Sequence, residues 1–204
     1  MIALVERLAR DFRAFAPELV AAPKSSLYRI YRDTRFSGNK APLKTHAAAG
    51  FPWRGLPRHE GAGLYLEVAG GWVWVGGGMW APQPPQLHRV REHIAETYPE
   101  IDRLRRAAAF KRMVGSLEGD RLTRVPRGFP RDHPAAEYLK HYRFVAGREF
   151  PAEFAIGDDF YPTVLRTFRA LMPIVRFLNE PLVDMTGFPA AMASVRDRRT
   201  QLSQ

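Results

Sequence analysis

One segment constrains the fold of this chain more than any other: residues 62–80 read as a β-hairpin. The stretch LYLEV is followed by Gly70 and Gly71, and WVWV alternates after them. A glycine pair between two alternating runs is a turn signal. Trp72 and Trp74 then point to one face of the hairpin, with the two valines on the other. The triplet Gly76–Gly78 lets the backbone bend or approach another group closely. The chain is therefore expected to contain an antiparallel sheet.

Helical and extended patterns alternate irregularly along the rest of the chain. Apolar residues at helical spacing predict helices over 2–16, 84–97 and 99–115, and a long one over 160–178 that Pro173 would kink or divide. Strands are expected over 27–31, 44–53 and 142–150. The order lacks regular βαβ alternation, which favours an α+β fold with a mainly antiparallel sheet packed with several helices. We expect a single domain over 1–188 and a frayed C-terminal tail over 189–204.

Composition narrows the class of protein. The chain has 204 residues, 46% of them hydrophobic, which excludes a disordered chain. It has no cysteine, so disulfides, Cys-based zinc sites and thiol nucleophiles are excluded. Charged residues interrupt the N-terminal apolar residues, and no run of about 18 apolar residues occurs elsewhere. We expect a cytoplasmic protein with no membrane partner; the oligomeric state is not indicated.

The net charge of +10 is unevenly distributed. Residues 1–60 carry an excess of +6 and residues 96–150 an excess of +4, whereas residues 61–95 and 151–204 are balanced. Arginine outnumbers lysine 26 to 5, which is also typical of a GC-rich genome. Two interpretations stay open: a solvated basic surface, or a local site for an anion.

The first basic segment is YRIYRDTRFSGNKAPLKTH, residues 28–46. Its cations outnumber its one carboxylate, Asp33, so they cannot all pair locally. Guanidinium groups bind carboxylate or phosphate in a two-point fashion. Candidate anion ligands here are Arg29, Arg32, Arg35, Lys40 and Lys44, with His46 beside them. The alternative is that Asp33 pairs with Arg32 or Arg35 and the other cations face water.

The second basic segment is RVPRGFPRDHPAAEYLK, residues 124–140. Arg127 and Lys140 could complete the same anion site. Asp132 next to His133 could orient an imidazole for acid–base chemistry, as Asp33 could orient His46. These four residues are the catalytic candidates if the protein is an enzyme. The alternative is that Asp132 caps a helix over 134–139 and His133 is simply hydrogen-bonded.

No other motif indicates a specific chemistry. The glycine triplet lacks the G-x-G-x-x-G spacing, so no dinucleotide site is expected, and no cofactor is predicted. His88 and His93 are five residues apart, which on a helix places them on different faces, and no metal site is predicted. The four tryptophans could stack on bases beside arginines, although we expect most of them to pack in the core.

Several segments together resemble a known family. Residues 28–46, GGGMWAP, PRGFPRDHP, YLKHYRF and RFLNEPL resemble, in this order, motifs of the domain of unknown function 2461 family, a bacterial and fungal group. The resemblance spans roughly residues 1–182 and implies no activity. Family members usually carry a further helical segment before the point at which this chain starts. Leu43 replaces a motif tyrosine, and Tyr142 and Arg143 stand where a Lys-Ser pair is common.

The resemblance falls on the two basic segments, which favours the local anion site. The leading hypothesis is a cationic pocket that binds a small phosphate- or carboxylate-bearing ligand. The alternatives are a nucleic-acid-associated protein with a basic, tryptophan-containing surface, which is the less favoured partner, and a structural protein whose arginines are held in ion pairs. Whether the protein is an enzyme is left open by the sequence.

Overall fold

A four-stranded antiparallel sheet organises the structure, a computed structural model that describes residues 1–31 and 42–183. Its strands follow each other in chain order: β1 (His46–Phe51), β2 (Gly63–Ala69), β3 (Trp72–Met79) and β4 (Phe144–Pro151). All three neighbouring pairs are antiparallel. The predicted hairpin is confirmed as β2 and β3, and so is the predicted final strand.

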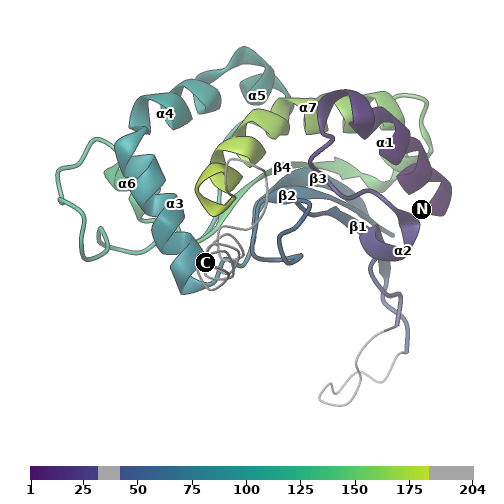
Figure 1. The fold of residues 1–204 in the computed structure, drawn as a ribbon. Helices are drawn as coiled ribbons and strands as arrows, with labels where there is room; N and C mark the ends of the chain where they lie inside the picture. The colour runs from purple at the N-terminus through teal and green to yellow at the C-terminus, as the bar shows by residue number, and fades with distance from the viewer. Residues whose placement is uncertain (32–41, 184–204) are drawn as a thin grey trace, which may run out of the picture.

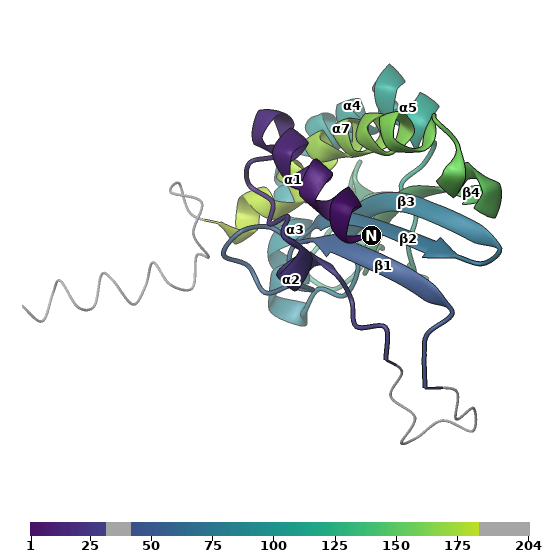
Figure 2. The ribbon, with the colours of Figure 1, turned by 90° about the vertical axis from the view of Figure 1, so that its right-hand side faces the viewer.

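The helices lie mostly to one side of this sheet. They are α1 (Ile2–Phe15), α2 (Pro23–Ser26), α3 (Pro84–Glu96), α4 (Tyr98–Arg106), α5 (Ala108–Met113), α6 (Ala136–Leu139) and α7 (Phe160–Asn179), with 3₁₀ turns η1 (Ala152–Ile156) and η2 (Glu180–Leu182). Figure 1 shows α1 and α7 above the sheet, and Figure 2 shows both crossing the same face. The predicted α+β class with one antiparallel sheet is confirmed.

The core lies between the sheet and helices α1 and α7. Leu64, Leu66, Val73 and Val75 point from the central strands into it and are at most 2% exposed. The ring of Phe12 from α1 meets that of Phe51 from β1 at 5.1 Å, edge to face. Burial of these apolar side chains is the main force that holds the helices on this face.

α7 runs unbroken through Pro173, which therefore does not divide the helix. The end of α7 is fixed to the start of β2. The side chain of Asn179 accepts a hydrogen bond from the Ala62 amide at 2.8 Å and donates one to the Ala62 carbonyl at 2.9 Å, and both residues are fully buried. One side chain thus satisfies both backbone polar groups of a buried residue.

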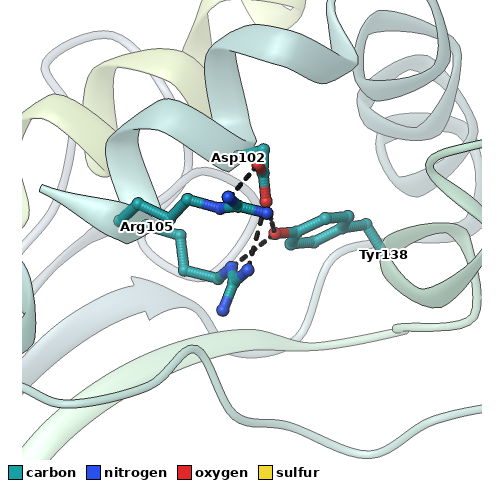
Figure 3. A network of polar contacts seen from close by, with 4 residues as sticks. Asp102, Arg105 and Tyr138 are labelled. Carbon is teal, nitrogen blue, oxygen red and sulfur yellow. Dashed lines mark hydrogen bonds and ion pairs between the residues drawn. The ribbon is translucent and has the colours of Figure 1, made fainter.

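A second polar network joins α4 to α6 (Figure 3). The Asp102 carboxylate accepts hydrogen bonds from Arg105 at 3.1 Å and from the Tyr138 hydroxyl at 3.2 Å, and pairs with Arg106 at 2.8 Å. The Arg105 Nε atom donates to the Tyr138 hydroxyl at 2.6 Å. Burial alone would raise the pKa of Asp102, but the hydrogen bond from Arg105 and the charge of Arg106 lower it overall.

One predicted segment, the strand over residues 27–31, needs correction, and another, the C-terminal tail, lies outside the described residues. Residues 27–31 do not form a continuous strand: a single bridge joins Leu27 to Ala49 of β1, and another joins Tyr31 to Leu43, which precedes β1. The predicted boundary at residue 188 and the tail beyond it lie outside the described residues. Within the described part of the chain, no helix has the length and apolar character to span a membrane.

Candidate functional site

The sheet face opposite α1 and α7 forms the floor of a cavity of about 700 Å³. All four strands contribute to it, together with Tyr28, the connection between β1 and β2, and residues 118–120. Its volume lies within the range of about 300–1,000 Å³ that is usual for small-molecule sites. A ligand-sized space therefore lies on the face that the helices leave open.

Glycines on this face make room for flat aromatic rings. Gly50, Tyr65, Gly76 and Gly147 stand opposite one another across the four strands. A Cβ atom on Gly147 would lie 2.3 Å from the ring of Trp74, and one on Gly50 would lie 3.2 Å from the ring of Tyr28. The Trp74 ring can therefore lie across the sheet only because residue 147 has no side chain.

The aromatic rings form a continuous band along the cavity floor. The ring of Tyr65 lies 5.8 Å from that of Tyr28 and 5.8 Å from that of Trp74, with interplanar angles of 70° and 58°. Trp72 and Trp80 also line the cavity. These distances are typical of favourable aromatic pairs. The band offers apolar ring faces and edges to a bound molecule.

A carboxylate stands in the middle of this band. The Tyr65 hydroxyl donates a hydrogen bond of 2.5 Å to Glu67 Oε2, and His46 Nδ1 lies 3.5 Å from Oε1. Burial, together with the hydrogen bond to Glu67, raises the pKa of Tyr65 strongly, so the phenol stays neutral and remains a donor. Glu67 is only 16% exposed but keeps further lone pairs for a ligand donor.

Two cations stand on the β1 side of the cavity. The guanidinium carbon of Arg58 lies 4.0 Å from the centroid of the Tyr28 ring, and its Nη2 atom donates to the Ser26 carbonyl at 2.5 Å. The Nε atom of Arg58 is buried and has no hydrogen-bond partner among the described residues. The ammonium of Lys44 lies 6.0 Å from the same ring centroid. This side combines an aromatic ring, that of Tyr28, with a hydrogen-bond donor, Arg58 Nε, that has no acceptor among the described residues.

The β4 side of the cavity is acidic. Glu118, Asp120 and Glu149 line it, and Arg143 pairs with Asp120 at 3.2 Å while its guanidinium lies 4.7 Å from the Trp80 ring centroid. Over the described lining, three arginine or lysine residues face four carboxylates. The described residues thus give a lining of mixed charge, with two of its three cations on the β1 side and three of its four carboxylates on the β4 side.

The first basic segment lies partly at this cavity. Lys44 and His46 line it, whereas Arg29 is exposed and is not part of its lining. The partner that the structure gives His46 is Glu67. The remaining candidates of this segment, Arg32, Asp33, Arg35 and Lys40, lie outside the described residues.

The second basic segment lies elsewhere, since Arg127, Asp132, His133 and Lys140 are all absent from the cavity lining. Lys140 pairs with Glu137 at 2.5 Å. The predicted Asp132 cap is wrong: α6 begins at Ala136, and no side chain caps it. Instead, His133 Nδ1 accepts a hydrogen bond from the Ala135 amide at 3.0 Å, which ties the imidazole to the loop before α6.

The sequence interpretation missed several residues of the cavity. Tyr65 and Glu67 carried a signal, because alternation puts them on the face opposite Leu64 and Leu66. Arg58 carried none, since it lies in an irregular connection. The expectation that most tryptophans pack in the core is wrong: Trp53 does, whereas Trp72, Trp74 and Trp80 line the cavity. Within residues 1–31 and 42–183, no group of three or more potential ligands could hold a metal ion.

The fold and the cavity together define a class: a small α+β protein with a ligand-sized hollow on the open face of an antiparallel sheet. The sequence model of one family, described as conserved hypothetical protein (DUF2461), matches residues 1–177. The chain belongs to this family, as its motifs predicted. Comparison with curated proteins and with solved structures gave no match.

Proposed function

We propose that this protein binds a small anionic molecule, bearing a phosphate or carboxylate group, in the cavity on the open sheet face. The observation that carries the proposal is the placement of Lys44 and Arg58 beside the Tyr28 ring on the β1 side. The absence of cysteine agrees with a cytoplasmic location, which we propose as well.

The physical case rests on Arg58. Its guanidinium lines the cavity beside the Tyr28 ring, so its positive charge attracts an anion bound there. Hydrogen bonds between guanidinium and an anion are stronger than neutral ones. Lys44, which is partly exposed and lines the cavity, adds a second positive charge. The proposal thus keeps Lys44 from the predicted set and adds Arg58; roles for Arg32, Arg35 and Lys40 remain predictions.

The test compares charged and uncharged ligands of the same shape. Tryptophan fluorescence of the full chain is titrated with benzoate and phenyl phosphate, and with benzyl alcohol as the uncharged counterpart. We expect at least one anion to bind about tenfold more tightly than the alcohol, and Lys44→Met to remove this advantage. Lys111→Met is the matched control, because Lys111 is exposed on α5 and outside the cavity lining. Equal binding of all three compounds would contradict the proposal.

A nucleic-acid-associated function is the second candidate, and the tryptophans on the open face favour it. Trp72, Trp74 and Trp80 line the hollow, and the guanidinium of Arg143 lies over Trp80. The four carboxylates of the same surface oppose a polyanionic backbone, so we rank it second. An affinity for single-stranded oligonucleotides that falls steeply with added salt, and that exceeds the affinity for the small anions, would reverse this order.

A further inference from the structure

The aromatic band favours a ligand with a flat ring. The Tyr65 ring contacts those of Tyr28 and Trp74 along the floor, and the glycines at 50, 76 and 147 leave room for these rings against the sheet. Planar rings of ligands stack on aromatic side chains of this kind. Nucleic-acid bases are an example, and each of them can stack because each has a π-face. A purely aliphatic ligand would make no use of this arrangement.

Glu67 indicates which polar groups that ring carries. Its carboxylate receives a hydrogen bond from Tyr65, and His46 stands beside its other oxygen at the longer distance of 3.5 Å. An ionised carboxylate accepts several hydrogen bonds and donates none. Because Glu67 lines the cavity at the centre of the band, a ring lying there would best present N–H groups to it.

The charges of the lining limit the charge of the ligand. Lys44 and Arg58 stand at the β1 side, whereas the β4 side has three carboxylates, Glu118, Asp120 and Glu149, against the single arginine Arg143. Four strands span roughly 14 Å, at about 4.8 Å between neighbours. One anionic group therefore fits the β1 side, while a chain of phosphates that extended over the band would approach the carboxylates and be repelled.

From these three features, and resting on the proposed anion site, we infer that the ligand is a nucleoside monophosphate or a molecule of the same design. Its heteroaromatic ring lies against Tyr65 and Trp74, its ring N–H groups donate to Glu67, and its phosphate meets Arg58 and Lys44. The cavity volume of about 700 Å³ accommodates a molecule of this size.

Calorimetric titration of the full chain separates the contributions of ring and phosphate. The ligands are the four common nucleoside 5′-monophosphates, their nucleosides, a triphosphate, and ribose 5-phosphate, which lacks the ring. We expect at least one monophosphate to bind at least about tenfold more tightly than ribose 5-phosphate and than its own nucleoside. The triphosphate should bind no more tightly than the monophosphate.

A single glycine variant tests the ring contact. In Gly147→Ala the three atoms nearest to the new Cβ are all ring atoms of Trp74, the closest at 2.3 Å, so the ring must move. We expect the affinity for the monophosphate to fall about tenfold and that for ribose 5-phosphate to stay unchanged. Gly70→Ala is the control on the same sheet, because a Cβ there meets nothing within 4 Å. Should Gly147→Ala not fold, Glu67→Gln is used in its place. The same ratio is measured, that of the affinity for the monophosphate to the affinity for ribose 5-phosphate, and it should fall in the same way.

The outcomes separate this inference from the function on which it rests. Ribose 5-phosphate that binds as tightly as every monophosphate, an unchanged ratio of affinities in folded Gly147→Ala, or no nucleotide binding at all would overturn the inference. None of these results decides whether the anion site exists, because the titrations with benzoate and phenyl phosphate test that site independently. Nucleosides that bind as tightly as their monophosphates, with no effect of Lys44→Met, would instead overturn the anion site.

Discussion

The two faces of the sheet are made by alternate residues of the same strands, yet they differ in almost every respect. Leu64 and Leu66 of β2 are buried in the core, whereas Tyr65 and Glu67, which alternate with them, line the cavity. The covered face is apolar and closely packed. The open face carries charges, hydroxyls and rings above a row of glycines. Residues that stabilise the fold and residues that line the cavity therefore alternate along the same strand.

The largest expected effect on stability comes from a substitution on the covered face. Leu66 is fully buried, so Leu66→Ala should lower the free energy of unfolding by about 2–5 kcal/mol through lost burial and a cavity. Denaturant unfolding measures the change. A loss of unfolding free energy below about 1 kcal/mol would contradict this description of the covered face, because the core around Leu66 would then be loosely packed.

An intermediate effect is expected from the α4–α6 network. Asp102→Asn removes the charge that Arg105 and Arg106 share, and should lower the Tm by a few degrees at neutral pH. The pKa of Asp102 is lowered in the folded state from its ordinary value of 3.8. Its contribution is therefore complete above that value and is lost as the pH falls through the folded pKa.

Thermal melts at neutral pH and at about pH 3 check this sign. The difference in Tm between Asp102→Asn and the unaltered protein should shrink in acid. A difference that grows in acid would show that the carboxylate is not stabilised by the arginines in the folded state.

The smallest effect on stability is expected on the open face. Tyr65→Phe removes one partly buried hydrogen bond to Glu67 and should cost about 0.5–1.5 kcal/mol. Denaturant unfolding again gives the value, with Leu66→Ala as the neighbour on the opposite face. A loss as large as that of Leu66→Ala would mean that Tyr65 belongs to the core.

Local patterns predicted most of the fold. The glycine turn between two alternating runs identified β2 and β3, and helical spacing identified α1, α3 and α7. Residues 27–31 were predicted wrongly as a strand because alternation cannot tell a continuous ladder from isolated bridges beside β1. The faces of the hairpin were assigned correctly, but not which of the two the helices cover.

The site was less predictable for a related reason. Tryptophans are large and apolar, so the core is their expected place, yet Trp74 fits on the open face because Gly147, more than 70 residues later, leaves space for its ring. That partner depends on the register of β3 with β4. Only Lys44 and His46 of the described candidates line the cavity, since sequence proximity to other cations says nothing about where a side chain points.

The hydrogen bonds between Asn179 and Ala62 tie the cavity to the last part of the fold. They join residues 117 positions apart, and Gly61, next to Ala62, lines the cavity. This edge of the hollow is complete only after α7 has docked, so it depends on a contact that closes a very long loop. Under the proposed function, ligand affinity and the docking of α7 would therefore be thermodynamically linked.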